Sequence, residues 1–471
     1  MGWTVADAIR ATGGRLVQGN PEASLNGFST DTRSIQSGSC FVALLGERHD
    51  GHAYLDDAAA KKVSAVIVGQ GRVQPPVSLP AEVAVIDVQD TLRALGDLAR
   101  YHRRLFEIPL VGITGSNGKT STKEMVAAIL SRRRRILKSS GNFNNLIGVP
   151  LTLLSLEPEH EAAVVEMGIN VPGEMARMVE MADPTIGLIT NIHPAHLEGL
   201  HSVDQILEEK GKLWEGLGPR GVAVVNKDDE NLRAFAQTLN LRRIMFSVQD
   251  ASEEVALVGS VEMTEEGSSF NLSLAGNTVP IHLSVLGDHH VANAVAAAAV
   301  SWAMGEGAEA IAEGLADHKP VKQRMQTHLL RSGRVLVDDS YNANPRSMIA
   351  AVQAVRKASR GRPVVAVLGD MKELGPKSPL LHHEVGRKIG ELGIEELITL
   401  GQMSREIAAG AQEVGLPAQA CRHAQSHEEI VEWLAGKESL REWILVKGSR
   451  SMTMEKVIDG LLSAEDWRRE G

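Results

Sequence analysis

The stretch Val111–Met125, VGITGSNGKTSTKEM, decides the fold of the central part of this chain. An apolar run, Ile108–Ile113, ends in a glycine-rich turn, and apolar residues at helical spacing follow. This order of strand, loop and helix is what a phosphate-binding loop needs. Glycines let backbone N–H groups close around phosphate oxygens, and the helix N-terminus adds partial positive charge. The loop residues that we expect to bind a nucleotide are Gly115, Ser116, Asn117, Gly118, Lys119, Thr120 and Ser121.

Two side chains of this loop carry its expected chemistry. Lys119 can reach the outer phosphates of a nucleotide, and the Thr120 hydroxyl can bind Mg²⁺. The loop departs from the standard G-x-x-x-x-G-K-[ST] pattern, because Ile113 stands where that pattern has glycine. The alternative interpretation is a glycine turn followed by a surface lysine, which the flanking strand and helix disfavour.

Composition limits the class of protein. A chain of 471 residues predicts about three domains at about 150 residues each. The net charge of −10 argues against non-specific nucleic-acid binding, and Arg132–Arg135 is interpreted as a solvated helix end. Cys40 and Cys421 lack metal-type spacing, which fits a reducing compartment. No apolar run approaches about 18 residues, so we expect a cytoplasmic enzyme with no membrane span and no nucleic-acid partner.

Residues 1–88 predict a small α/β domain with a polar cluster at a loop, FSTDTR. Short clusters of Ser, Thr, Asp and Arg can hold a diphosphate or the edge of a uracil. Taken alone, such clusters are more often turns. The candidate residues are Ser29, Thr30, Asp31 and Arg33.

Residues 89–319 predict the nucleotide-binding domain. The apolar run Ala162–Val165 presents Glu166 at its C-terminal end, where a Mg²⁺ ligand belongs beside a phosphate loop. A helix cap or a solvent-facing carboxylate is the alternative. His193 and His196 invite a zinc interpretation, but no third close ligand completes such a site.

The string NKDD, Asn226–Asp229, follows an apolar run and imitates the guanine-recognition string of GTPases. A phosphate loop together with N-K-x-D would suggest a nucleotide switch. The loop spacing differs from that of GTPases, and the strand that ends at Glu166 lacks a D-x-x-G string. We therefore interpret Asn226–Asp229 as a bystander.

The last part of the chain changes pattern twice. Alternating residues over Val255–Leu286 predict antiparallel strands with turns at Glu265–Gly267 and Gly276–Asn277. From residue 320 to 471 strands and helices alternate, which predicts a doubly wound sheet of Rossmann type. Its predicted strand ends carry DDSYNANPRSM, GDMKELG and KGSR, and α/β sheets bind ligands at such ends.

These strings together carry a family resemblance. TGSNGKTST, GNFNN, EMG, AHLEG, DDSYNANP and GDMKELG resemble the Mur ligases, whose relatives include the folylpolyglutamate synthases. The resemblance covers essentially the whole chain. It implies an α/β protein of three domains: a small N-terminal α/β substrate domain, a central P-loop-type ATP-binding α/β domain with a small antiparallel β portion, and a C-terminal Rossmann-like doubly wound domain.

The resemblance also implies a set of site residues, with ATP and Mg²⁺ as cofactors. Thr120, Glu166 and His196 would organise Mg²⁺, and Lys119 and Arg324 would contact phosphates. In several family members a lysine at the position of Lys210 is carbamylated, whereas an exposed lysine is the alternative. The remaining implied contacts are Asn293 with adenine, Asp339 with ribose, Ser29, Thr30, Asp31 and Arg33 with the UDP end, and Asn142 and Asn145 with the muramoyl peptide.

Within the family, SYNANP and GDMKELG are similar to members that add D-alanyl-D-alanine to UDP-N-acetylmuramoyl-tripeptide through an acyl phosphate. The chain has no D-N-P-R string, which members that add diaminopimelate use. A monomer is expected, and the third domain is expected to close over the second. The alternatives are an amide ligase for another amino acid and a non-catalytic nucleotide switch.

Overall fold

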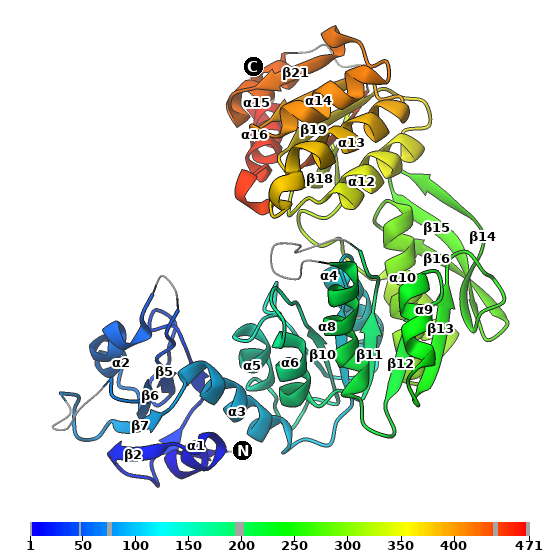
Figure 1. Ribbon diagram of the computed structural model, residues 1–471. Coiled ribbons are helices and arrows are strands. Elements are labelled where there is room, and N and C mark those ends of the chain that lie inside the picture. The colour runs from blue at the N-terminus through cyan, green and yellow to red at the C-terminus, as the bar shows by residue number, and fades with distance from the viewer. Residues whose placement is uncertain (1, 47–48, 73–77, 194–201, 437–440, 468–471) are drawn as a thin grey trace.

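The computed structural model describes residues 2–46, 49–72, 78–193, 202–436 and 441–467. These residues form three α/β bodies that follow one another along the chain (Figure 1). The C-terminal body, coloured yellow to red, lies over the central body, and the N-terminal body in blue lies beside it. The predicted three-domain α/β architecture is confirmed.

The N-terminal body contains a five-stranded sheet in the order β2-β7-β6-β5-β4. All its described neighbours are parallel except β2 and β7. Helix α3, Thr91–Arg103, packs against α1 and leads into the central body. The other elements are α1 (Val5–Thr12), β2 (Arg15–Gln18), β4 (Phe28–Ser29), β5 (Cys40–Val42), α2 (Leu55–Ala60), β6 (Ala65–Gly69) and β7 (Ala84–Val88), with a small pair of β1 (Trp3–Thr4) and β3 (Ser24–Leu25).

The central body is built on a nine-stranded sheet of the described residues, in the order β16-β15-β14-β13-β12-β11-β8-β10-β9. The seven strands β8 to β14 are joined by parallel pairs. The hairpins β14–β15 and β15–β16 are antiparallel, as the alternating pattern predicts. The strands are β8 (Leu110–Thr114), β9 (Ile136–Lys138), β10 (Ala162–Glu166), β11 (Ile186–Ile189), β12 (Val222–Asn226), β13 (Arg242–Ser247), β14 (Val255–Thr264), β15 (Gly267–Leu274) and β16 (Asn277–Leu283).

Helices cover both faces of this sheet, so β8 is buried on both sides. One face packs against α4 (Lys119–Leu130), α10 (Asp288–Ala303) and α11 (Ala308–Ala316). The other packs against α3 and four more helices: α5 (Gly148–Leu153), α6 (Glu174–Ala182), α8 (Val203–Glu215) and α9 (Glu230–Gln237). Burial on both faces explains why the strand before the phosphate loop is apolar throughout.

The turn between β8 and α4 depends on glycine. Gly118 precedes α4 with φ of 84°, and Gly115 has φ of 145°, both in the region that favours glycine. A Cβ on Gly118 would lie 2.2 Å from Oδ1 of Asn293 on α10, so the loop and that helix touch closely. The predicted order of strand, glycine loop and helix is confirmed.

The C-terminal body has a six-stranded sheet in the order β17-β18-β22-β19-β20-β21, parallel except at β17–β18. The sequence pattern did not predict strands β17 (Gln326–Leu329) and β21 (Cys421–Ala424), because these edge strands are short and polar. The other strands are β18 (Val335–Asp339), β19 (Val364–Gly369), β20 (Glu396–Leu400) and β22 (Trp443–Lys447); the helices are α12 (Pro345–Ala358), α13 (Ser378–Glu391), α14 (Ser404–Glu413), α15 (His427–Ala435) and α16 (Glu455–Trp467). The domain limits 1–88, 89–319 and 320–471 stay predictions.

The exposed residues Arg132, Arg133 and Arg135 directly after α4 agree with the interpretation of a solvated helix end, but Arg132 and Arg134 also form ion pairs. Helix α4 ends at Leu130, and Arg132 pairs with Glu313 and Asp317 at the end of α11. Arg134 pairs with the buried Glu306 at 3.0 Å. These arginines therefore fasten the end of α4 to the segment around α11, a contact between residues distant in sequence.

Across the part of the chain that the structure describes, every helix is too short or too polar to cross a bilayer.

The close contact of α13 with α14 gives a stability prediction. A Cβ on Gly386 would lie 2.0 Å from the Ile407 carbonyl oxygen, although alanine is intrinsically favoured over glycine in helices by up to about 1 kcal/mol. We expect Gly386→Ala to lower the free energy of unfolding by about 1–3 kcal/mol, measured by urea denaturation. Gly460→Ala is the control, since its Cβ would meet only the Val431 side chain. Equal stability of both variants would contradict this packing.

Candidate active site

The main cavity, of about 970 Å³, lies between the central and C-terminal bodies. It sits at the carboxyl ends of β8, β10, β11 and β12 and faces those of β18 and β22, where open α/β sheets bind ligands. Of the residues that the sequence singles out, those lining it are Ser116, Asn117, Gly118, Lys119, Thr120, Ser121, Asn142, Glu166, Asn293, Arg324 and Asp339.

The phosphate loop is held in shape by its own neighbours. The Lys119 ammonium turns back and donates to the Gly115 carbonyl at 2.8 Å. The backbone N–H of Asn117 donates to Asn191 Oδ1 at 3.0 Å, and the Thr190 hydroxyl donates to the Asn117 carbonyl at 2.6 Å. Burial lowers the pKa of Lys119 below its usual range. A loop with an enclosed lysine and a helix N-terminus is suited to polyphosphate.

Glu166 and Thr120 provide a set of oxygen atoms that fits Mg²⁺. The Thr120 hydroxyl donates to Glu166 Oε1 at 3.1 Å, and Asn144 Nδ2 donates to the same oxygen at 2.8 Å. Glu166 is 1% exposed, and its Oε2 has no hydrogen-bond partner among the described residues. The described residues hold no group of three or more His, Cys, Asp or Glu that could bind a metal. The Thr120 hydroxyl and the unpartnered Glu166 oxygen are compatible with Mg²⁺, which takes few protein ligands and completes its coordination with phosphates and water.

The sequence singles out two histidines, His193 and His196, for this part of the site. His196 lies outside the described residues. His193 lines the cavity, and its Nδ1 accepts a hydrogen bond from Arg346 Nη1 of the C-terminal body at 3.1 Å. Burial and the Arg346 charge lower the pKa of His193 to about 4, so this imidazole is neutral at pH 7.

The C-terminal body reaches the phosphate loop directly. Arg324 stacks over the Tyr341 ring at 4.2 Å and donates from Nη2 to Thr120 Oγ1 at 3.4 Å. Asn344, at the start of α12, donates from Nδ2 to Asn117 Oδ1 at 2.7 Å. These two contacts bring the strand ends of both bodies around one cavity.

Asp339 is already engaged in this arrangement. Its Oδ2 accepts from Lys447 Nζ at 2.6 Å, and its Oδ1 accepts from the Met325 N–H at 3.2 Å. Lys447 is 3% exposed and comes from the KGSR string at the end of β22. The carboxylate that the resemblance assigns to ribose is thus held between two segments of the C-terminal body.

The NKDD string forms a structural junction at the cavity wall. Asp229 accepts the Ile192 N–H at 2.7 Å and the Leu232 N–H at 3.2 Å through its two carboxylate oxygens. Both carboxylate oxygens of Asp228 also accept hydrogen bonds, from the Ser247 hydroxyl and the Val248 N–H. These contacts tie β11, β12 and β13 together, so the four oxygens are occupied within the protein.

Comparison with known proteins supports an assignment from most of the chain. Residues 113–301 match the Mur ligase middle domain, residues 323–450 the Mur ligase glutamate ligase domain, and residues 24–103 the Mur ligase catalytic domain. The chain belongs to the Mur ligase family.

Individual Mur ligases are similar over nearly the full length. The chain is 36% identical over 440 residues to the UDP-N-acetylmuramoyl-tripeptide--D-alanyl-D-alanine ligase of Escherichia coli (strain K12), with 93% of this chain and 94% of that protein covered. A crystal structure of MurF from Acinetobacter baumannii superimposes with a TM-score of 0.88 at 32% identity, covering 98% of this chain and 99% of the other. MurF ligase from Thermotoga maritima in complex with ADP gives 0.82 at 25% identity, covering 94% and 98%.

Lys210 of this Mur ligase lies in the interior on α8. It is 2% exposed, so the alternative of a surface lysine is wrong. Burial and the nearby positive charge of Lys119 lower the pKa of Lys210 well below its usual value. The periodicity of α8 places Lys210 beside Ile206 and Leu213 on the buried face, a signal that the acidic neighbours Glu208 and Glu209 obscure.

Several predicted site residues lie outside the cavity lining, namely Gly115, Lys210, Asn145 and the N-terminal cluster Ser29, Thr30, Asp31 and Arg33. Asn145 Oδ1 accepts the backbone N–H groups of Ile147 and Gly148 at 3.1 and 2.8 Å, a local role at the start of α5. In the N-terminal body, Arg33 pairs with Asp31 at 2.6 Å and lowers the pKa of that carboxyl to about 2. The structure does not bring the cluster Ser29, Thr30, Asp31 and Arg33 to the phosphate loop.

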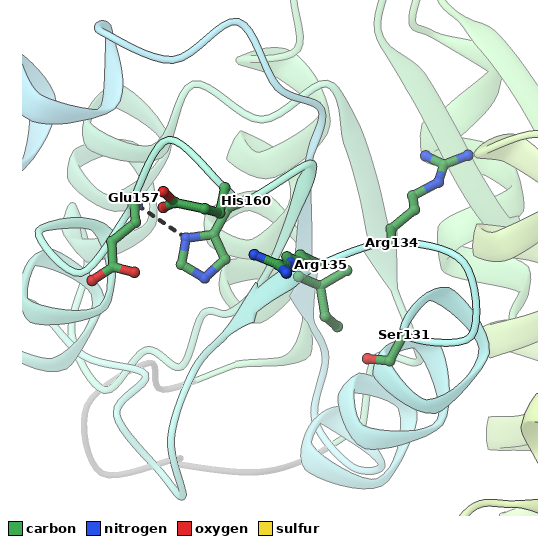
Figure 2. A pocket seen from close by; sticks show the side chains of 7 residues that line it. Ser131, Arg134, Arg135, Glu157 and His160 are labelled. Atoms are coloured by element: carbon green, nitrogen blue, oxygen red, sulfur yellow. Dashed lines mark hydrogen bonds between the residues drawn. The ribbon is translucent and has the colours of Figure 1, made fainter.

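A second hollow, of about 710 Å³, follows α4 on the far side from the phosphate loop (Figure 2). Its His160 accepts the Glu157 N–H at 2.9 Å, and Arg134 points away from that pair toward the segment around α11. These side chains are engaged with one another or with the protein, and the hollow lacks a glycine loop. The cavity at the phosphate loop is therefore the candidate active site.

Sequence reasoning missed Asn144, Asn344 and Lys447. Each lines the cavity and hydrogen-bonds a residue that the sequence did single out. The available signals were the polar strings GNFNN, SYNANP and KGSR at strand ends. These strings indicate which strand ends lie at the cavity, but they do not indicate which of their side chains point into it.

The occupied carboxylates of the NKDD string generate a prediction about the nucleobase. Guanine recognition needs a carboxylate that is free to accept hydrogen bonds from the base. Here the carboxylates of Asp228 and Asp229 accept hydrogen bonds from the protein itself. We expect kcat/KM with ATP to exceed that with GTP by about 100-fold in a coupled ADP- or GDP-release assay. Asp229→Asn should lower the melting temperature and leave the ATP-to-GTP ratio unchanged. Equal kcat/KM values for the two nucleotides would contradict this interpretation.

Proposed function

We propose that this Mur ligase joins D-alanyl-D-alanine to UDP-N-acetylmuramoyl-tripeptide at the expense of ATP, a step in peptidoglycan precursor synthesis. The observation that carries the proposal is the cavity of about 970 Å³ in which the phosphate loop faces the SYNANP segment of the C-terminal body. Relatives named for this reaction share 32–36% identity with the chain, and the E. coli protein is covered over 94% of its length.

The chemistry is activation of a carboxylate. The terminal carboxylate of the tripeptide attacks the γ-phosphorus of ATP and releases ADP, which gives an acyl phosphate. The amine of D-alanyl-D-alanine then attacks the acyl carbon, loses a proton, and phosphate leaves as the amide forms. Such a reaction needs positioning and charge neutralisation more than a covalent enzyme intermediate.

Residues of this chain supply the positioning. Lys119 and the loop amides hold the outer phosphates, and Arg324 approaches the γ-phosphate from the C-terminal body. Thr120 and Glu166, together with His196, would hold Mg²⁺, which would supply neutralisation of the phosphate charge. Asn293 and Asp339 contact adenosine. Asn142 and Asn145 contact the muramoyl peptide. The UDP end of the substrate binds at the cluster Ser29, Thr30, Asp31 and Arg33.

The wider setting of the enzyme is part of the proposal. We place it in the cytoplasm, because its nucleotide substrates and its two unpaired cysteines, Cys40 and Cys421, suit a reducing compartment. We also propose that it is a monomer. The C-terminal body closes further over the central body during the reaction, a hinge motion on the microsecond to millisecond scale.

The reaction is tested by a panel of UDP-muramoyl peptides against amines. We expect ADP and phosphate release only when UDP-N-acetylmuramoyl-tripeptide and D-alanyl-D-alanine are both present, because both must occupy the cavity for transfer. Each single substrate with ATP is the control. Equal or faster turnover with a single amino acid and a shorter UDP-muramoyl peptide would reject the assignment.

Lys210 has the properties that a carbamate requires. Carbon dioxide adds to a neutral amine, and a pKa lowered by burial keeps the Lys210 amine neutral at lower pH than an exposed lysine. The product is an anion with oxygen atoms of the kind that Mg²⁺ prefers, whereas a lysine cation would repel the metal. We propose that Lys210 is carbamylated in the active enzyme.

Substitution at Lys210 tests this role. We expect Lys210→Ala to lose about 100-fold in kcat, and a short carboxylic acid to restore part of the loss by replacing the carbamate oxygens. Lys212→Ala is the matched control, because Lys212 lies on the same helix, half-exposed, and pairs with Glu215. A carbamate signal in the ¹³C NMR spectrum of the enzyme under ¹³CO₂ should disappear only in Lys210→Ala. Near-normal kcat without Lys210 would reject the role.

A further inference from the structure

Lys123 is a fully buried lysine one turn beyond the phosphate loop on α4. A charge with no exposure is costly unless it is paired and hydrogen-bonded. Its ammonium donates to the Ser139 carbonyl at 2.8 Å and to the Gly141 carbonyl at 3.1 Å, and it pairs with Glu124 Oε1 at 2.9 Å. These three contacts account for its three N–H groups.

A fourth neighbour of the ammonium is Glu166, the carboxylate beside Thr120. The distance from Lys123 Nζ to Glu166 Oε2 is 3.9 Å, which is too long for a hydrogen bond but close enough for strong attraction in a buried setting. Glu166 Oε2 has no hydrogen-bond partner among the described residues. Lys123 therefore compensates the buried negative charge and leaves this oxygen's lone pairs free for a cation.

The same lysine fixes the polypeptide around Glu166. The segment 139–144 passes over it: the Ser139 hydroxyl accepts the Glu166 N–H at 3.0 Å, and Asn144 Nδ2 donates to Glu166 Oε1. Because Lys123 binds two carbonyls of this segment, it joins α4, the asparagine-rich segment and the end of β10. Asn142 and Asn144, which line the cavity, lie on that segment.

We propose that Lys123 is a positioning residue that moderates, through its charge, the attraction of Glu166 for a divalent cation and holds the segment 139–144 in place for the muramoyl peptide. This inference rests on the proposed function and deepens it. Lys123 touches neither nucleotide nor peptide: its charge sets how strongly Glu166 attracts the cation, and its hydrogen bonds set where the asparagines stand. The two effects are separable by experiment.

The charge effect is measured by calorimetry of ADP binding at a series of Mg²⁺ concentrations. In Lys123→Met, a neutral side chain of similar length, we expect the Mg²⁺ concentration for half-maximal enhancement of ADP affinity to fall about tenfold, because one nearby positive charge is removed. In steady-state assays of the same variant, the KM for UDP-N-acetylmuramoyl-tripeptide should rise about tenfold, because the Ser139 and Gly141 carbonyls are released.

Lys138→Met is the matched control. Lys138 pairs with the other oxygen of the same Glu124 at 2.5 Å, but its side chain is 46% exposed. Among the described residues its ammonium forms no hydrogen bond or ion pair with Glu166, Ser139 or Gly141. We expect this variant to keep both the Mg²⁺ requirement and the KM for the peptide. A shift as large as that of Lys123→Met would assign the effect to Glu124 and overturn the proposal.

Glu124→Gln supplies a second variant with an opposite expectation. It removes the carboxylate that shares the Lys123 charge, so the Mg²⁺ requirement should rise severalfold. If Lys123→Met does not fold, the Mg²⁺ requirement of Glu124→Gln, compared with that of Lys138→Met, tests whether the Lys123 charge acts on Glu166. An unchanged Mg²⁺ requirement in the folded variants would overturn the role of Lys123. Lack of amine-dependent turnover in the wild-type enzyme would instead reject the proposed function, whereas the ADP-binding series would still decide the charge effect.

Discussion

The site depends on the position of β8 between β10 and β11. Parallel pairing sets Glu166 opposite Ile113 and Ile189 opposite Thr114, so three strands end at one edge. The phosphate loop leaves β8 there, the acidic side chain comes from β10, and Thr190 and Asn191 at the end of β11 hold the loop. A shift of one residue in this register would turn Glu166 to the other face of the sheet.

Near that edge the protein buries charges of both signs. Lys123 and Lys210 are buried, as are the carboxylates of Glu166 and Glu209, and burial lowers the pKa of Lys119 and Lys210. Such an arrangement is expensive in an isolated protein, because each ion has lost water. At this edge the phosphate loop and the N-terminus of α4 provide the N–H groups and partial positive charge that favour phosphate.

The C-terminal body meets this edge through polar contacts. Asn344 with Asn117, Arg324 with Thr120 and Lys357 with Asp288 are hydrogen bonds or exposed ion pairs, and interfaces of this kind permit relative motion of domains. Apolar packing joins the two bodies as well, because Met263 of β14 and Leu286 belong to the same buried cluster as the core of the C-terminal body. The proposed domain closure therefore concerns the polar contacts at the cavity, since contacts made by polar groups are easily remade.

The sequence by itself determined the α/β class, the strand, loop and helix at Val111–Met125, and the antiparallel hairpins after Val255, because these depend on local periodicity and on glycine. It also marked the polar strand ends, because parallel strands of one sheet expose such ends together. Only the tertiary structure decided that Lys210 is interior, that Asp228 and Asp229 bind backbone groups, and that Lys123 reaches Glu166. Those facts depend on which faces of distant segments meet, and a side chain's burial and charge environment are set by residues that sequence order does not place beside it.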